Sequence, residues 1–247
     1  MQDTTTPSTV VITGASSGIG LGLAQAYLER GFNVVANARS DDRLAAAAEQ
    51  LGNPARFFGV AGDIGRRDTA QKLIDRAVER FGQVDVLINN AGIFTARPFV
   101  EYTEEELDQI VATNVKGFVY ASQAAAKHMI PRRKGHIVNI TASIALQPHL
   151  KVPALLPVLV KGGVNAATRA LAIELSPYNI QVNAVAPGIV DTPMHPSETH
   201  GFLNGLAPAG RIAQVREIAD AVLYLSGADF TTGVVLAVDG GASAGTW

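Results

Sequence analysis

Three unequally spaced glycines, Gly14, Gly18 and Gly20, follow a run of β-branched residues and precede an amphipathic segment over residues 21–30. That order predicts a buried strand, a tight turn and a helix. Glycine there lets the chain leave the sheet, removes a side chain where a pyrophosphate approaches the backbone, and lets the helix pack closely. Amides at the helix start then face the phosphates. The residues therefore predict a dinucleotide site, with a plain glycine turn as the alternative.

Two further residues follow predicted strands at positions where ligands bind. Ser143 comes just after a strand expected over 135–141, and Arg39 ends a strand expected over 32–38. Open parallel sheets bind ligands at the carboxyl ends of their strands, where arginine accepts the extra phosphate of NADP and an acidic residue takes the ribose of NAD. Arg39 therefore favours NADP, although Asp41 and Asp42 follow closely and would spoil the pocket if they faced it. The alternatives are a solvated arginine and an ordinary loop serine.

Asp63 and Asn114 each have two interpretations. Asp63 follows a strand expected over 56–60 and either contacts a ligand or caps a helix that starts at Arg66. Asn114 lies within a helix expected over 103–120, which opens with the capping-box pair Thr103 and Glu106. An asparagine inside a helix competes for backbone hydrogen bonds, so Asn114 needs either a function or a solvated position.

Composition bounds the remaining classes of function. The chain has 247 residues, of which 47% are hydrophobic, carries a net charge of −2 and contains no cysteine. It is long enough for one large core, and nothing in its charge predicts binding to nucleic acid or to an acidic membrane surface. Disulfides, thiolate metal sites and a cysteine nucleophile are excluded. The longest apolar run, 152–160, is too short to span a bilayer.

Strand-like and helix-like segments alternate along the chain, which predicts a single doubly wound α/β domain of the Rossmann type over residues 9–247. We expect a mostly parallel sheet of about seven strands with helices on both faces. Residues 1–8 predict a loose tail without the features of a secretion signal, and hence a cytoplasmic protein. The polar stretch around 193–210 predicts a mobile lid. The remaining helices are expected over 42–51, 69–81, 164–175 and 217–225.

The spacing Thr-Gly-x-x-x-Gly-x-Gly from Thr13, together with Asn89-Asn90-Ala91-Gly92, resembles the short-chain dehydrogenase/reductase family. The resemblance runs from about Val10 to the last glycines. It implies binding of NADP(H), preferred over a possible NAD(H), with no metal. It also implies catalytic roles for Asn114, Ser143 and Lys161. The residues implied to bind cofactor are Gly14, Ser16, Ser17, Gly18, Ile19, Gly20, Arg39, Asp63, Ile64, Asn90, Ala91, Gly92, Lys161, Pro187, Gly188, Val190 and Thr192.

The resemblance assigns individual roles as well. It implies that Asp63 bonds the adenine amino group, that Asn89 stabilises the sheet, and that Asn114 kinks its helix and holds a water beside the lysine. Thr192 is expected near the nicotinamide carboxamide. Relatives form dimers and tetramers, so we expect a homotetramer.

One family motif is broken. The family places a tyrosine, its general acid or base, four residues before the lysine; this chain has Pro157 four residues before Lys161, within an apolar segment that contains no tyrosine. A proline is tolerated if the helix starts within about one turn of it. The chain is therefore identified as an atypical member that lacks the active-site tyrosine. Substitute proton donors are His149, His195, His200 and Ser143.

Two classes of function remain. The first is an oxidoreductase that transfers hydride between NADP(H) and a small carbonyl or imine, with a substrate wall around Leu155–Leu159. An already protonated imine would need little help with a proton. The second is a non-catalytic cofactor binder, either a sensor or a silent subunit. Non-redox chemistry such as dehalogenation is disfavoured, because relatives that perform it keep the tyrosine and replace the lysine.

Overall fold

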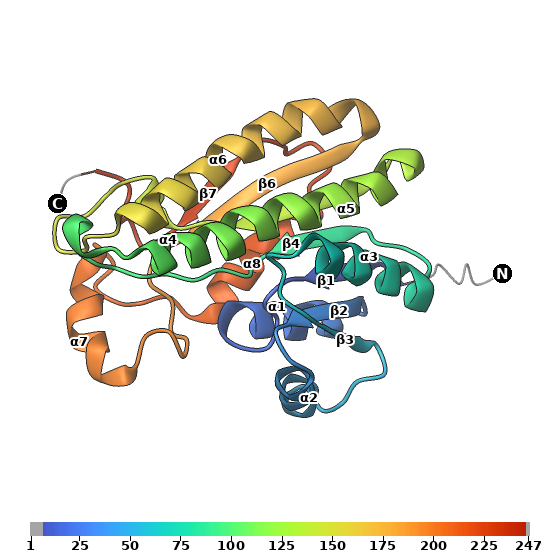
Figure 1. Ribbon diagram of the computed structural model, residues 1–247, viewed down its shortest axis with the longest axis horizontal. Coiled ribbons are helices and arrows are strands. Elements are labelled where there is room, and N and C mark those ends of the chain that lie inside the picture. The colour runs from blue at the N-terminus through green and yellow to red at the C-terminus, as the bar shows by residue number, and fades with distance from the viewer. Residues whose placement is uncertain (1–6, 246–247) are drawn as a thin grey trace.

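A computed structural model describes residues 7–245 and forms one seven-stranded parallel sheet with helices on both faces (Figure 1). The strand order is β3-β2-β1-β4-β5-β6-β7, with parallel pairing at every step. The order confirms the doubly wound prediction. The first six residues of the predicted tail lie outside the described part. The strands are β1 (Thr9–Ile12), β2 (Asn33–Ala38), β3 (Phe57–Ala61), β4 (Val86–Asn89), β5 (Gly135–Ile140), β6 (Ile180–Pro187) and β7 (Val235–Val238).

Successive strand residues feed two separate cores. Val10 and Ile12 of β1 pack on one face with α1 and α8, whereas Val11 faces α3 and α5 across the sheet. The five inner strands are therefore buried on both sides, as is usual in parallel sheets, and the edge strands β3 and β7 are less buried. The helices are α1 (Gly18–Glu29), α2 (Asp41–Gln50), α3 (Arg67–Phe81), α4 (Glu104–Ile110), α5 (Gly117–Arg132), α6 (Leu155–Leu175), α7 (His200–Leu203) and α8 (Val215–Leu225).

The helix predicted over 103–120 begins as expected and then differs. The capping box is present, since Thr103 Oγ1 accepts from the Glu106 amide at 3.2 Å and the Glu106 carboxylate accepts from the Thr103 amide at 3.0 Å. After α4 the chain forms a π-helical stretch, Val111–Lys116, and then continues as α5 to Arg132. The predicted end at residue 120 is wrong: the helix continues, and Ala121, Ala124 and Ala125 pack into the core.

The start of α6 also differs from the prediction of 164, because α6 begins at Leu155. Pro157 is its third residue and is buried. A residue in the first turn has no helical carbonyl partner for its amide, so proline costs no hydrogen bond there. The prolines therefore mark the beginning of this helix and not a break before it. Over residues 7–245 no helix has the length and apolar character needed to cross a membrane.

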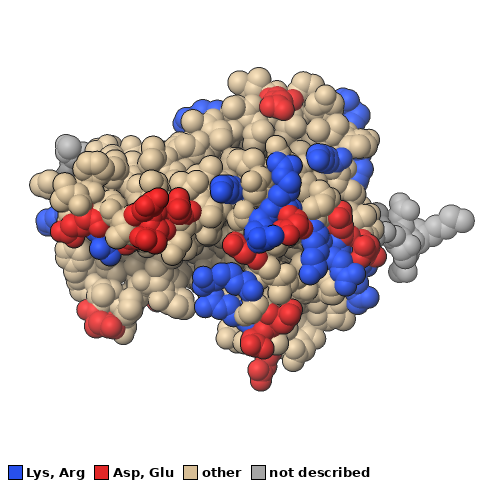
Figure 2. All heavy atoms as spheres, in the orientation of Figure 1, with Lys and Arg blue, Asp and Glu red and all other residues tan. Residues whose placement is uncertain are grey.

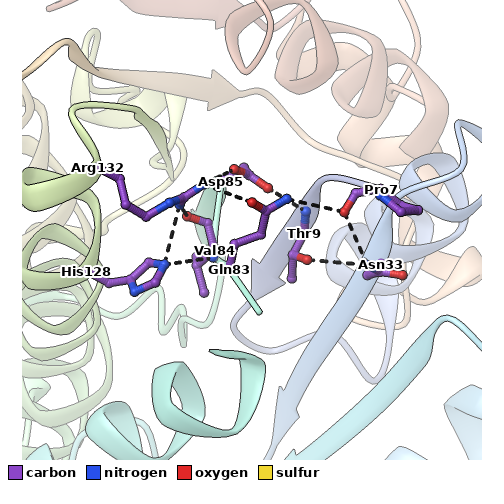
Figure 3. A network of polar contacts seen from close by, with 8 residues as sticks. All are labelled: Pro7, Thr9, Asn33, Gln83, Val84, Asp85, His128 and Arg132. Carbon is purple, nitrogen blue, oxygen red and sulfur yellow. Dashed lines mark hydrogen bonds and ion pairs between the residues drawn. The ribbon is translucent and has the colours of Figure 1, made fainter. Parts of the chain in front are cut away.

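A polar network lies at the end of the sheet where the strands begin (Figure 3). The buried Asp85 carboxylate accepts from the Thr9 amide and from Arg132 Nη2, each at 2.8 Å. Arg132, in the last turn of α5, also donates to the Val84 carbonyl at 2.7 Å. Burial, followed by the charge of Arg132, lowers the pKa of His128, which accepts from the Val84 amide at 3.2 Å. The network joins β1, the start of β4 and the end of α5.

Arg132→Met is expected to destabilise the protein by about 3 kcal/mol, because it leaves the Asp85 carboxylate buried without its ion-pair partner. Chemical denaturation measures the change. Arg76→Met is the matched control, since the Arg76–Glu79 pair is exposed and solvent screens it. Equal effects of the two substitutions would contradict this role for Asp85.

Candidate active site

A cleft of about 1000 Å³ lies at the carboxyl ends of the strands. The loops after β1, β2, β4, β5 and β6 converge on it, as expected for an open parallel sheet. Every residue from Gly14 to Thr192 that the sequence implied to bind cofactor lines this one cleft. The structure brings them together, and their binding of a cofactor stays a prediction.

The glycine loop has the close approaches that require glycine. Gly14 has a φ of +65°, and a Cβ there would lie 2.8 Å from the Ala91 Cα atom. Gly18, the first residue of α1, has a φ of +54°. A Cβ on Gly20 would overlap the Gly14 carbonyl and lie 2.6 Å from Asn90 Nδ2. Gly20 therefore lets α1 approach the loop itself.

Thr13 and Asn90 fix this loop to the end of β4. Thr13 Oγ1 accepts from the backbone amides of Asn90 and Ala91, each at 3.0 Å. Asn90 Nδ2 donates to the carbonyls of Thr13 and Gly14, also at 3.0 Å. The side-chain amide of Asn90 is thus directed at the loop. Its contribution to the cleft is to hold the loop in shape.

Asn89 has the sheet-stabilising position expected of it. Its Nδ2 donates to Ser122 Oγ at 2.9 Å and to Asn139 Oδ1 at 2.8 Å. Asn139 in turn donates to Thr168 Oγ1 at 2.9 Å. This buried chain joins β4, α5, β5 and α6.

Arg39 lines the cleft at the end of β2 and is exposed, and Arg43 on α2 lines it as well. Sequence reasoning missed Arg43. The signal was its place in the first turn of the helix that follows Arg39, at the helix end nearest the predicted phosphate site. Asp41 and Asp42 do not line the cleft, so they do not spoil it. Basic side chains gather beside α2 on the face drawn in Figure 2.

Asp63 does not cap the following helix, so the capping interpretation is wrong. The helix α3 begins at Arg67, and its N-cap residue is Arg66. Asp63 Oδ1 instead accepts from the Gly65 amide at 2.9 Å, in a turn that precedes the helix. The carboxylate stays exposed and lines the cleft.

Lys161 lies on α6, one turn after Pro157, and lines the cleft. Its Nζ donates to the Ile140 carbonyl at the end of β5, at 2.6 Å. A Cβ on Gly92 would lie 3.2 Å from Nζ, so the glycine leaves the amine uncovered on that side. Burial lowers the pKa of the ammonium to about 8.

Asn114 lies in the π-helical stretch and is buried, so a solvated position is wrong for it. Its Oδ1 accepts from the Ile93 amide at 2.9 Å, and its Nδ2 donates to the Ile93 carbonyl at 3.0 Å. It does not line the main cleft. It lines a second cavity of about 10 Å³, together with Lys161. That volume suits about one water molecule. Asn114 is therefore a neighbour of the lysine, behind the cleft.

Ser143 lines the cleft beside the end of β5, whereas the predicted substrate wall does not. Leu155–Leu159 are absent from the cleft lining; Leu156 packs against Ile110 in a small separate core. The wall prediction is wrong because the helix starts earlier than expected: it buries Leu156 and Pro157 in protein and leaves Leu155 and Leu159 exposed outside the cleft lining. Among the described residues, apolar side chains that line the cleft and are exposed at its mouth are Phe94, Leu150, Met194 and Phe202.

The three candidate histidines lie in different environments. His149 and His195 line the cleft, and His200 does not. His195 Nδ1 lies 2.9 Å from the Val190 carbonyl. His200 Nε2 lies 2.9 Å from the His195 carbonyl and 3.9 Å from Asp191. The segment predicted as a lid folds into short helical turns, Ser197–Thr199, α7 and Asn204–Leu206.

A parallel doubly wound sheet, a glycine loop at the start of α1 and a lysine on α6 that reaches the end of β5 together define a dinucleotide-binding α/β protein. A family model described as short chain dehydrogenase matches residues 8–201. The chain therefore belongs to the short-chain dehydrogenase/reductase family, a family of oxidoreductases.

Known proteins resemble the chain over nearly its full length. Gluconate 5-dehydrogenase of Gluconobacter oxydans (strain 621H) is 37% identical, with 94% of this chain and 93% of the relative covered. The structure of ElxO with NADP bound has a TM-score of 0.91 at 26% identity, covering 97% of this chain and 100% of that one. The 3-ketoacyl-(acyl-carrier-protein) reductase from Brucella melitensis, complexed with NADH, has a TM-score of 0.90 at 31% identity, covering 96% and 98%.

Gly20→Ala is expected to lower the free energy of unfolding by about 1–3 kcal/mol, because the added methyl group overlaps the Gly14 carbonyl and forces α1 away from the loop. Chemical denaturation measures it. Gly162→Ala is the matched control within α6, where a Cβ meets nothing within 4 Å. The control is expected to be neutral or to stabilise by about 0.5–1 kcal/mol. A harmless Gly20→Ala would show that the loop adjusts freely.

Proposed function

We propose that the protein is an oxidoreductase that transfers hydride between NADP(H) and a small carbonyl or imine compound, with a proton source other than tyrosine. The observation that carries the proposal is the single cleft in which the glycine loop, Arg39, Ser143 and Lys161 meet. A site for phosphate, a site for the ribose and a polar centre at the end of β5 then lie along one surface.

The residues of the cleft fit a nicotinamide dinucleotide. The glycine loop leaves a cradle in which a Cβ would meet neighbouring atoms, and the amides at the start of α1 suit a pyrophosphate. Arg39 and Arg43 suit the additional phosphate of NADP, since guanidinium groups bind phosphate in a fixed geometry. We propose NAD(H) as a second cofactor for the same site. The neighbours that hold NADP and NADH support both assignments.

When bound, the cofactor supplies or accepts the hydride. Lys161 is placed to hold the nicotinamide ribose, and Ser143 to orient the reacting group by a hydrogen bond. Asn114 keeps the π-helical stretch against Ile93 and thereby fixes the far side of the lysine. Pro157 stands where the family places its tyrosine, so the proton comes from another group.

The mouth of the cleft suggests the size and character of the substrate. Phe94, Leu150, Met194 and Phe202 are exposed there, which favours a compound with an apolar body. We propose that residues 193–210 act as the lid over it. We also propose a cytoplasmic homotetramer, and exposed apolar side chains away from the cleft, such as Ile173 on α6 and Phe230 before β7, support an association surface.

A non-catalytic cofactor binder is the second candidate, and the burial of Pro157 in the first turn of α6 favours it. Pro157→Tyr separates the two functions, with Pro157→Phe as the matched control that lacks only the hydroxyl. For the oxidoreductase we expect wild-type turnover of ketones with NADPH. A gain in kcat/KM in Pro157→Tyr alone would show that the rest of the site is competent, whereas no gain would point to a rebuilt pocket with different chemistry. Cofactor binding without wild-type turnover would favour the second candidate.

Cofactor preference is tested by titrating the protein with NADPH and NADH and following the nicotinamide fluorescence. NADPH is expected to bind more tightly. In Arg39→Ala/Arg43→Ala its affinity should fall about 10–100-fold, since hydrogen bonds to charged groups contribute about 1.5–3 kcal/mol, while NADH binding changes little. Arg76→Ala is the control, because Arg76 is an exposed residue of α3 that does not line the cleft. If neither nucleotide binds, the oxidoreductase proposal fails.

A further inference from the structure

Several groups that line the cleft can carry a proton, and Lys161 differs from the others in its surroundings. His149 and Lys151 belong to the loop after β5, and His195 belongs to the lid, where its Nδ1 is engaged with the Val190 carbonyl. A serine hydroxyl such as that of Ser143 needs a neighbouring base before it exchanges its proton readily. Lys161 alone among these extends from a long helix to the end of β5.

The Lys161 ammonium has more N–H donors than the one that bonds the Ile140 carbonyl. Nζ has three N–H groups, and one of them donates to the Ile140 carbonyl at 2.6 Å. Over residues 7–245 no carboxylate pairs with it, and the neighbouring elements offer it only uncharged groups: the β5 carbonyl, Gly92 after β4 and Asn114 in the π-helical stretch. Gly92 keeps the approach to Nζ clear of a side chain.

The acidity of the group suits a proton donor. Burial without a compensating negative charge lowers the pKa of Lys161 to about 8, well below the ordinary value of about 10.4. A general acid is most effective when its pKa lies near the working pH, because it is then mostly protonated and still gives up its proton readily.

We propose that Lys161 itself donates the proton during reduction and that the substrate is a neutral carbonyl compound. The proposal rests on the proposed function. An N–H bond of the ammonium breaks as an O–H bond forms on the carbonyl oxygen, and the carbonyl carbon receives hydride from the reduced nicotinamide. The products are an alcohol, the oxidised nicotinamide and the neutral amine, which then takes a proton from water.

The same charge selects between carbonyl and imine. A protonated imine is a cation, and an unpaired ammonium at the reacting centre repels it. A neutral carbonyl oxygen accepts a hydrogen bond from that ammonium and becomes more negative as hydride arrives, so the interaction strengthens in the transition state. The site therefore favours ketones and aldehydes over iminium compounds.

The first experiment measures kcat/KM with NADPH against pH for acetophenone and cyclohexanone, and for 3,4-dihydroisoquinoline as the imine. We expect carbonyl reduction to be level below about pH 8 and to fall tenfold per pH unit above it, as the ammonium loses its proton. The imine is expected to be the poorer substrate. An inflection near 6.5, the ordinary histidine value, or a faster reaction with the imine would overturn the proposal.

Lys161→Arg separates donation from binding, because arginine keeps the positive charge but does not give up a proton in proteins. We expect NADPH affinity within a few-fold of wild type, and kcat/KM for the carbonyls about 10²–10⁴-fold lower. Lys127→Arg on the exposed face of α5 is the matched control. Unchanged turnover in Lys161→Arg would overturn the role of Lys161 and leave the proposed function standing. If wild type binds no NADPH, or reduces neither class of compound, both proposals fail.

A readout independent of turnover is the rate at which acetic anhydride acetylates each lysine at a series of pH values, followed by peptide mass spectrometry. Lys161 is expected to reach half its maximal rate near pH 8, whereas the lysine of an unstructured peptide added as an internal standard does so near the ordinary value of about 10.4. Equal titration of Lys161 and of the peptide lysine would overturn the proposal.

Discussion

The hydrogen bonds between Thr13 and the turn after β4 are the constraint on which the rest of the site depends. They join the carboxyl ends of β1 and β4, the two strands at which the sheet reverses its order. Asn90 completes the connection by donating to the loop carbonyls. Because Ala91 and Gly92 follow directly, the same contacts also fix the surface that faces Lys161. A single turn thus sets the phosphate end of the cleft and its reacting end.

The fold was largely predictable from the sequence because most strands are short apolar segments that contain valine or isoleucine and alternate with helix-like segments. Errors arose in the extents of two helices. The chain is helical beyond the end predicted at residue 120, and α6 begins at Leu155 and not at 164. Pro157 lies in the first turn of α6, where its missing amide proton costs no hydrogen bond. The substrate wall was misplaced because α6 begins earlier than predicted.

The site residues that lie on loops after the strands were predictable from the sequence. The directions of side chains on helices were harder to predict from the sequence. Arg43 was missed, and Asn114 lines the small cavity behind the cleft and not the cleft itself. The π-helical stretch that carries Asn114 has no simple sequence signature, and the hydrogen bonds of Asn114 join it to the backbone of Ile93, far from it in the sequence. Within residues 7–245 Lys161 has no carboxylate partner, and this too could be found only from the three-dimensional contacts.

The proline in the first turn of α6 has a consequence for how such a protein changes over time. Its amide would have had no partner in any case, so residues of very different chemistry are interchangeable there with the backbone intact. Proline at a compatible position also restricts the unfolded chain, which stabilises a protein by about 0.4–1 kcal/mol. A substitution between an ionisable residue and proline at this position would therefore change reactivity and stability together, with the backbone of α6 intact.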